Sequence, residues 1–244
     1  MTINHNLFLD LAFHLAERNL GQTKLNPSVG TVIVKNKSVI SSGVTSLNGR
    51  PHSEFNALKN LKNCSGASLY TTLEPCTHYG KTPPCTNIII KRKIKNVYYA
   101  FEDPDTRTFK KAKKILSKKG VRTKLIKTKN YVNFYRSYFI NKKLSIPFIT
   151  AKIAISRDYF TINKKEKWIT NEASRNKVHL LRNMHDCILS TSKSINQDDS
   201  LLNCRINGLN NKKPDLFIID LKLKLKKKLS LNKYLKIRKT FLIT

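Results

Sequence analysis

Residues 51–54 read P-H-S-E, and residues 72–85 read T-L-E-P-C-T-H-Y-G-K-T-P-P-C. His52, Cys76 and Cys85 offer one imidazole and two thiolates, which is the donor set of a catalytic zinc ion that keeps its fourth position open. Glu54 lies two residues after His52, too near to bind the same ion comfortably and well placed to move protons beside it. The stretch therefore predicts a zinc site with an acid–base residue next to it.

The order of these residues, His-x-Glu followed by Pro-Cys and a second Cys, is the signature of zinc nucleobase deaminases. In that chemistry zinc lowers the pKa of water, hydroxide attacks an amidine carbon, and the glutamate carries a proton to the leaving ammonia. A structural zinc site is the alternative, and His78 could supply the fourth protein ligand that such a site needs. That alternative leaves Glu54 without a role.

Hydrophobic periodicity predicts strands that alternate with helices along the first 126 residues. Such an order is typical of a three-layer α/β domain with a largely parallel sheet, whose ligand site lies at one end of the strands. Pro83 and Pro84 place Cys85 in the first turn of a helix, where the helix dipole favours a thiolate. We expect helices over residues 7–19, 52–61, 85–93 and 109–119, a hairpin of 31–34 with 38–42, and strands at 67–73, 96–101 and 121–126.

Length and composition fit a folded enzyme of one or two domains. The chain has 244 residues, of which 40% are hydrophobic, and it contains no apolar run of the roughly 18 residues that a membrane span requires. Five cysteines, an odd number with two in the metal motif, favour a reducing, cytoplasmic location over a disulfide framework. No membrane partner and no secretory signal are expected.

The formal net charge of +32 has two interpretations. One is nucleic-acid binding, which would place basic residues in a local patch among aromatic side chains. The other is compositional bias, because lysine is spread through nearly every segment. The spread favours bias, so we do not expect a nucleic-acid partner. A positive field would still attract a phosphorylated substrate.

The spacing of the cysteines carries a resemblance. Eight residues separate Cys76 from Cys85, where generic deaminases have two, and residues 26–30 read N-P-S-V-G. Both features resemble the deaminase domain of the bifunctional riboflavin-biosynthesis deaminase/reductase family. The resemblance implies a cytidine-deaminase-like fold for residues 1–145, with a helical connector at their end. It also implies hydrolytic deamination of 2,5-diamino-6-(5-phosphoribosylamino)pyrimidin-4(3H)-one to 5-amino-6-(5-phosphoribosylamino)uracil.

The same resemblance assigns substrate contacts. Asn26 matches the asparagine that holds the pyrimidine ring, although an Asn before Pro also suits a simple turn. His78, Lys81 and Thr82 would bind the base or the ribose phosphate, or else form a solvated loop. Glu74 is expected to be a structural hydrogen-bonding group. After Asp103 and Pro104 the family has two glycines, whereas residues 105–111 here read D-T-R-T-F-K-K.

Residues 146–244 resemble the family's reductase domain, a dihydrofolate-reductase-like α/β region, which implies NADPH as cofactor. The chain ends before the family's glycine-bearing cofactor loop, so we expect reductase activity to be lost and a separate protein to supply it. Strands are expected at residues 148–155, 216–220, 221–225 and 241–244. The positions that match cofactor or substrate contacts of the family are Ala154, Trp168, Arg182, Asp198 and Arg205.

Three other functions stay open at this point. The chain could keep both activities, deamination and NADPH-dependent reduction. Its charge suggests a tRNA adenosine deaminase, but the cysteine spacing speaks against it. It could instead be a relic whose second half serves as a dimer or partner surface, and exposed strand edges suggest a homo-oligomer.

Overall fold

The chain folds into two units, Met1–Ile149 and Thr150–Thr244. The structure is a computed structural model that describes residues 4–128, 130–161, 168–209 and 214–244. No helix in these described ranges combines the length and the apolar character that a membrane span requires.

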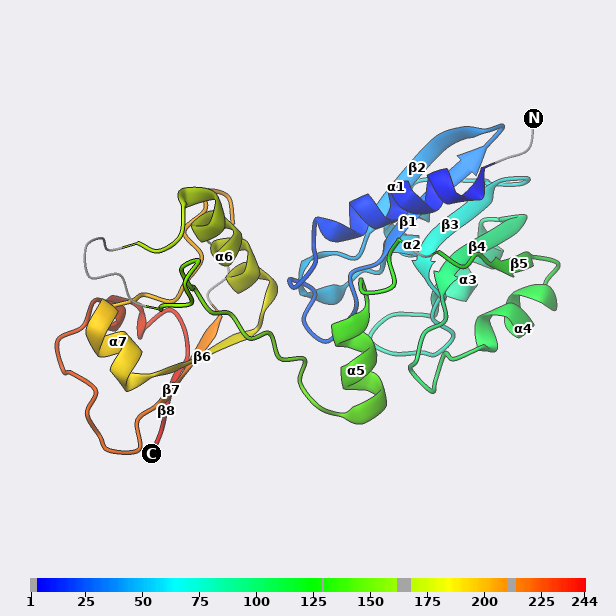
Figure 1. Cartoon of the computed structure of the whole chain (residues 1–244). Coiled ribbons are helices and arrows are strands. Elements are labelled where there is room, and N and C mark those ends of the chain that lie inside the picture. Colours follow the sequence, from blue (N-terminus) through cyan, green and yellow to red (C-terminus); the bar gives the residue numbers. More distant parts are fainter. Residues whose placement is uncertain (1–3, 129, 162–167, 210–213) are drawn as a thin grey trace. The chain divides into compact units, whose positions relative to one another are not determined.

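The first unit is built on a mixed sheet of five strands in the order β2-β1-β3-β4-β5 (Figure 1). Strand β1 pairs antiparallel with both β2 and β3, whereas β3 with β4 and β4 with β5 pair parallel. Four strands therefore run in one direction and β1 alone runs against them, close to the largely parallel sheet that was predicted. The strands are β1 (Gly30–Lys35), β2 (Ser38–Val44), β3 (Ser68–Leu73), β4 (Asn96–Phe101) and β5 (Arg122–Leu125).

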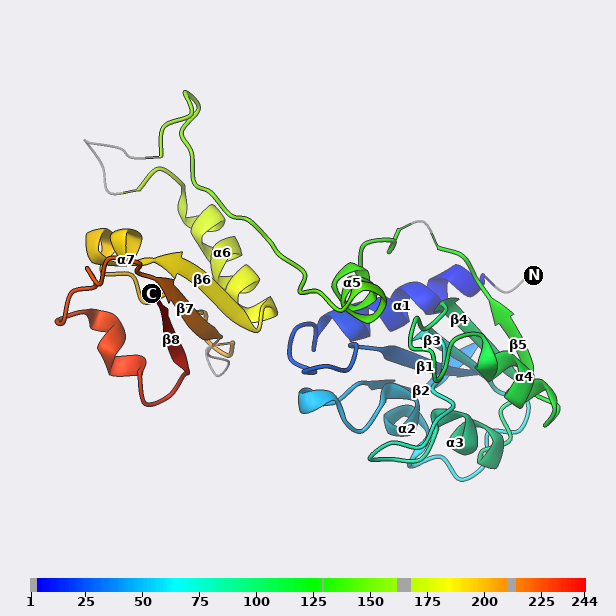
Figure 2. The same cartoon turned by 90° about the horizontal axis from the view of Figure 1, so that it is seen from below.

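Helices cover both faces of this sheet, which gives the three layers expected from the sequence (Figure 2). Alternate strand residues divide between two cores, so Ile33 and Leu69 belong to one core and Val32 and Tyr70 to the other. Helices α2, α3 and α4 supply residues to the first core, and α1 with the segment around α5 to the second. The helices are α1 (His5–Glu17), α2 (Ser53–Leu58), α3 (Cys85–Lys91), α4 (Lys111–Ser117) and α5 (Arg136–Leu144).

Two glycines allow helices to approach the sheet closely. A Cβ atom on Gly30 would lie 1.8 Å from the carbonyl oxygen of Ala12 in α1, and one on Gly43 would lie 2.4 Å from the carbonyl oxygen of Ser53 in α2. Since α2 begins at Ser53, the contact at Gly43 fixes the start of that helix against β2. This start carries the His-x-Glu motif.

The second unit holds a parallel sheet of three strands in the order β6-β7-β8. A small core of Ile195, Leu216, Ile218, Leu229 and Leu231 joins the sheet to α7 and the 3-10 helix η2. The elements are α6 (Glu172–Met184), β6 (Cys187–Thr191), α7 (Ser192–Asp198), β7 (Asp215–Ile219), η2 (Ser230–Tyr234) and β8 (Thr240–Ile243).

Two predicted strands of this region are wrong. Residues 148–155 and 221–225 form no strand, although their apolar or alternating sequences favour one. A strand needs a hydrogen-bonding neighbour and a cover for its apolar side chains, and the described residues supply neither here. Ile149 is accordingly 80% exposed and Leu223 71% exposed. The predicted strands at 216–220 and 241–244 correspond to β7 and β8.

Candidate metal centre and its pocket

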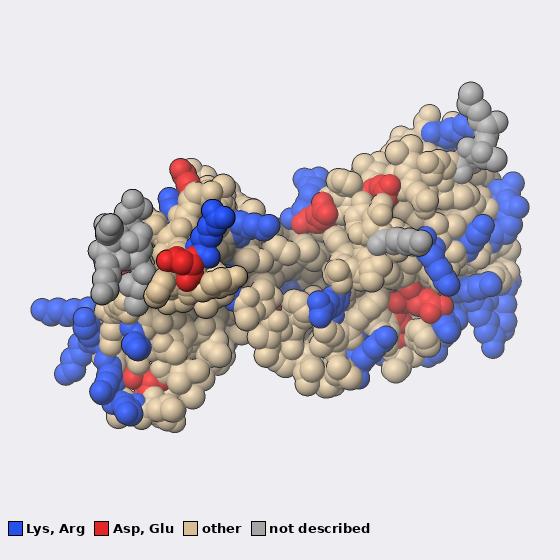
Figure 3. Space-filling view, in the orientation of Figure 1, with Lys and Arg blue, Asp and Glu red and all other residues tan. Residues whose placement is uncertain are grey.

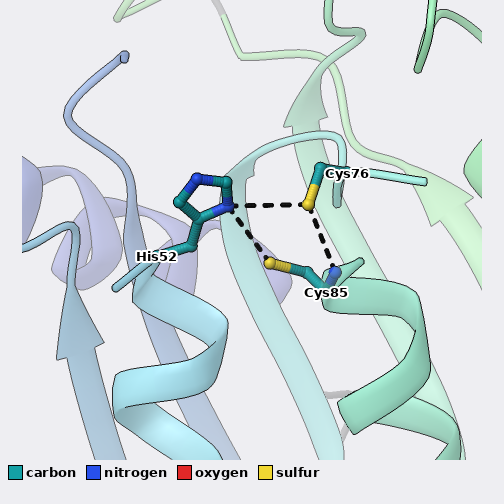
Figure 4. A group of neighbouring side chains, drawn as sticks. All are labelled: His52, Cys76 and Cys85. Atoms are coloured by element: carbon teal, nitrogen blue, oxygen red, sulfur yellow. Dashed lines mark hydrogen bonds between the residues drawn. The ribbon is translucent and has the colours of Figure 1, made fainter. Parts of the chain in front are cut away.

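His52, Cys76 and Cys85 meet at one end of the sheet of the first unit (Figure 4). The Nδ1 atom of His52 lies 3.5 Å from Sγ of Cys76 and 3.4 Å from Sγ of Cys85. The possible ligand atoms of all three residues lie within 4.8 Å of one another, and these three form the group of potential metal ligands found in the described part of the chain. One imidazole and two thiolates at this spacing fit a zinc ion with an open fourth position.

Three different elements carry these ligands. His52 occupies the N-cap position of α2, Cys85 is the first residue of α3, and Cys76 lies in the loop after β3. The backbone N–H of Cys85 donates to Sγ of Cys76 at 3.2 Å, which ties the loop to the start of α3. Two ligands therefore sit at helix starts, where the partial positive charge favours anionic ligands. This is the arrangement that the sequence predicted.

The two thiols share their environment unequally. A hydrogen bond from Cys85, added to one with His52, lowers the pKa of Cys76 to about 4, in spite of burial. The bond with Cys76 and complete burial raise the pKa of Cys85 well above its usual value. These opposite shifts favour the thiolate form at Cys76 over that at Cys85, and a bound metal ion would deprotonate both.

Glu54 lies directly beside the metal ligands. It is 4% exposed, and its Oε2 atom accepts hydrogen bonds from Sγ of Cys85 at 3.4 Å and from Oγ of Ser53 at 3.1 Å. Burial, followed by the charge of Cys76, raises the pKa of Glu54. A carboxylate with a raised pKa near a metal site is suited to accept and return a proton. The hydroxyl of Ser53 also contacts Oγ1 of Thr31 at 2.8 Å.

Glu74 has a structural role, as expected. Its carboxylate accepts backbone hydrogen bonds from Asp103 at 3.3 Å, Lys110 at 3.1 Å and Ala112 at 3.0 Å. Burial raises the pKa of Glu74, and the three N–H donors oppose that shift. The residue therefore fastens the loop after β4, which forms one wall of the site, to the end of β3.

A pocket opens over Glu54 and two of the three metal ligands, His52 and Cys76. It lies entirely within the first unit and collects residues from segments far apart in the sequence. Four acidic and three basic side chains contribute to its wall. The lining residues are Asn26, Pro27, Val29, Thr45, Arg50, His52, Glu54, Leu73, Glu74, Cys76, His78, Asp103, Asp105, Arg107, Tyr138 and Lys142.

The wall contains an ion cluster that the sequence did not predict. Arg107 contacts Asp105 through two hydrogen bonds, of 2.9 Å from Nε and 2.6 Å from Nη2, and Lys142 donates to the same carboxylate at 3.2 Å. The Arg107 guanidinium holds the pKa of Asp105 well below its usual range. Tyr138 donates to Asp103 at 3.0 Å. The one sequence feature that could have indicated this cluster is the replacement of the family's two glycines by residues 105–111, which include Asp105 and Arg107.

The predicted substrate contacts fall into two groups. Asn26 and His78 line the pocket; the Asn26 amide donates to the carbonyl of Gly49 at 3.0 Å. Thr82 and Lys81 do not line it. Thr82 accepts a hydrogen bond from Arg50, which does, and Lys81 is exposed. His78 is not in the metal group, so the fourth ligand of a structural zinc site is not supplied there.

In the second unit, two of the five residues matched to the reductase domain come together. Arg182 and Arg205 both donate to Asn203, to its carbonyl and its side-chain oxygen respectively. Ala154 lies in an irregular segment, Asp198 is exposed at the end of α7, and Trp168 is 54% exposed beneath the guanidinium of Arg175. Their roles stay predictions.

Basic side chains are scattered over both units on the face drawn in Figure 3, rather than confined to one patch. This distribution is the one expected for compositional bias. The absence of a nucleic-acid partner stays a prediction.

Comparisons with known proteins find a matching family for each half of the chain. Residues 2–101 match the family described as "Cytidine and deoxycytidylate deaminase zinc-binding region", and residues 147–244 match "RibD C-terminal domain". The riboflavin biosynthesis protein RibD of Bacillus amyloliquefaciens is 36% identical over 220 residues, which are 88% of this chain and 59% of the relative. RibD of Buchnera aphidicola subsp. Baizongia pistaciae is 36% identical over 84% of this chain and 57% of the relative.

Solved structures of the same family resemble nearly the whole of this chain. A structure of RibD from Acinetobacter baumannii has a TM-score of 0.87 at 29% identity, covering 98% of this chain and 70% of that one. The deaminase/reductase of Thermotoga maritima, titled a diaminohydroxyphosphoribosylaminopyrimidine deaminase/5-amino-6-(5-phosphoribosylamino)uracil reductase, has a TM-score of 0.86 at 29% identity, covering 98% and 69%. The chain spans somewhat more than half the length of the curated relatives it matches, 59% for the first.

Proposed function

Because the chain belongs to the family of the riboflavin biosynthesis protein RibD, we propose that its first unit is a zinc-dependent pyrimidine deaminase. The substrate is 2,5-diamino-6-(5-phosphoribosylamino)pyrimidin-4(3H)-one, and the product is 5-amino-6-(5-phosphoribosylamino)uracil. The observation that carries the proposal is the convergence of His52, Cys76 and Cys85 beside a buried Glu54 at the base of a pocket.

The residues have separate tasks. His52, Cys76 and Cys85 hold the zinc ion, which lowers the pKa of a water molecule when bound. The Glu54 carboxylate accepts a proton from the attacking water and returns it to the amine nitrogen that leaves as ammonia. Asn26 and His78, which line the pocket, hold and orient the pyrimidine ring. Ser53 keeps the Glu54 carboxylate in place through the hydrogen bond to Oε2.

A second activity is favoured by the match of residues 147–244 to the RibD C-terminal domain. That region would reduce the ribose of the deaminated product with NADPH, using the side chains of Trp168, Arg182, Asp198 and Arg205. The alternative is a deaminase that hands its product to a separate reductase. A cytoplasmic location and self-association through strand edges stay predictions.

One coupled assay tests both activities. Purified protein with one equivalent of zinc is given the diaminopyrimidine substrate, and ammonia release and NADPH consumption are followed together. Ammonia release supports the deaminase, and NADPH loss that depends on prior deamination supports the reductase. Zinc-loaded protein that releases no ammonia from this substrate would refute the proposal.

A further inference from the structure

Arg50 differs from the other cations of the pocket wall. Arg107 and Lys142 both bind the carboxylate of Asp105. In the described part of the chain no carboxylate lies within ion-pair distance of Arg50. Its positive charge is therefore not neutralised by the protein.

The guanidinium of Arg50 is nevertheless held in place. Nη1 donates to Oγ1 of Thr82 at 2.7 Å, and Nη2 passes close to Gly80, where an added Cβ would lie 3.3 Å away. Arg50 is only partly exposed and lines the pocket together with His52, two residues further along the chain. The hydrogen bond to Thr82 uses one donor of a group that has five, so several remain for a ligand.

The acids that share the pocket cannot take this charge, because most of them are already engaged. Glu74 accepts three backbone hydrogen bonds. Asp103 accepts from Tyr138 and from the backbone of Asp105, and Asp105 binds Arg107 and Lys142. Glu54 contacts Cys85 at the metal centre. A fixed, unpaired guanidinium in such a pocket is suited to a planar or tetrahedral anion from outside the protein.

We propose that Arg50 binds the phosphate of the substrate's phosphoribosyl group and that Thr82 orients Arg50 for this contact. The inference rests on the proposed function and deepens it. It gives Thr82 an indirect role, since its hydroxyl contacts the arginine. It also places the main phosphate contact at Arg50 instead of Lys81, which is exposed and does not line the pocket.

Kinetics with two substrates test the assignment. The Arg50→Ala variant should raise KM for the phosphorylated substrate by roughly 10- to 100-fold, the range for losing a charge-assisted hydrogen bond, and should leave KM for the dephosphorylated ribosyl compound nearly unchanged. Arg50→Lys keeps the charge but not the fork geometry, so an intermediate KM is expected. Arg18→Ala, which removes an equal charge from an exposed position after α1, is the matched control.

Three results would overturn the assignment. They are an equal effect of Arg50→Ala on both substrates, an effect no larger than that of Arg18→Ala, and a near-normal Arg50→Ala beside a strongly impaired Lys81→Ala. The zinc content shows whether each variant is folded. If Arg50→Ala does not fold, the KM of Arg50→Lys for the phosphorylated substrate tests the assignment instead.

Direct binding separates this inference from the proposed function. Ribose 5-phosphate, titrated by calorimetry, needs no turnover and should bind at least 10-fold more weakly to Arg50→Ala than to the unchanged protein. If Arg50→Ala binds ribose 5-phosphate more weakly but the unchanged protein releases no ammonia, the phosphate site is supported and the deaminase proposal is refuted. If the unchanged protein releases ammonia but both proteins bind ribose 5-phosphate equally, the deaminase proposal is supported and the phosphate site is refuted.

Discussion

Glu54 and Glu74 are two buried carboxylates in the wall of one pocket, and replacing each by glutamine should have opposite consequences. Both are less than 5% exposed. Glu54 contacts the side chains of Cys85 and Ser53, whereas Glu74 accepts hydrogen bonds from three backbone N–H groups. We predict that Glu54→Gln lowers turnover by about 10²- to 10⁴-fold without loss of stability, and that Glu74→Gln destabilises the first unit without removing the chemistry.

The magnitude for Glu74→Gln follows from its acceptors. Oε1 accepts from Ala112, and Oε2 accepts from Asp103 and Lys110. A glutamine has one oxygen, so at least one buried N–H must face the new NH₂ group, at a cost of about 1–3 kcal/mol. The remaining hydrogen bonds lose the assistance of the charge. The free energy of unfolding should fall by about 2–4 kcal/mol in total.

The magnitude for Glu54→Gln follows from its role in proton transfer. Removing a general acid–base group typically lowers the rate by about 10²- to 10⁴-fold. The amide keeps the size of the side chain and removes a charge that burial disfavours, so stability should not decrease.

Two measurements test these predictions. Denaturant unfolding, with zinc release measured alongside it, gives the stability of each variant. Ammonia production per zinc-loaded molecule gives its activity. Turnover of Glu54→Gln within 10-fold of the unchanged protein would refute the acid–base assignment. An unchanged unfolding midpoint for Glu74→Gln would refute the hydrogen-bond accounting. Lost turnover in a fully stable Glu74→Gln protein would show that this residue takes part in the chemistry.

Three further predictions address the metal centre, the ion cluster and the helix–sheet contact. Cys76→Ala should release zinc at chelator concentrations that leave the unchanged protein loaded, because two ligands remain; equal retention in a metal analysis would contradict the ligand assignment. Arg107 keeps the pKa of Asp105 below its unfolded value, so the pair contributes about 1 kcal/mol above pH 4 that is lost as the pH falls further. Asp105→Asn should therefore be less stable at pH 7 and converge with the unchanged protein in acid, whereas a gap that does not vary with pH would oppose the reasoning. Gly30→Ala should lower the unfolding free energy by about 3 kcal/mol, because its Cβ would overlap the Ala12 carbonyl; a thermal midpoint equal to that of the unchanged protein would contradict the close approach.

The metal centre was predictable because its information is local. Proline before Cys85 sets a helix start, and the His-x-Glu pair sits at another, so the ligand geometry follows from short-range rules. The alternation of strands and helices likewise predicts the three layers. The direction of β1, the one reversed strand, was also predictable. The turn of lysine and asparagine between β1 and β2 makes a hairpin, so the two strands run antiparallel.

The rest depends on neighbours that no local pattern reveals. Residues 148–155 have the composition of a strand, but no described residues pair with them. The pocket wall joins Arg50, the loop around Asp105 and the helix that carries Lys142, which lie far apart in the sequence. Tyr135 lies in the segment for which the sequence predicts only a helical connector, yet it is buried and its hydroxyl hydrogen-bonds Thr72 at 2.6 Å.

Charge illustrates why the pocket has to be considered apart from the composition. The chain has 47 Lys and Arg residues against 15 Asp and Glu residues, so most cations lack an acidic partner, and an unpaired lysine on the surface carries no information. The pocket wall reverses this ratio with four acids and three cations. A cation without an acidic partner is therefore least expected there by chance. The carboxylates of the pocket are engaged by backbone groups, tyrosine, cysteine or other cations, so the charge of Arg50 is available to an anionic substrate. Substitution of Arg50 should therefore impair binding of the phosphorylated substrate more than substitution of Lys81.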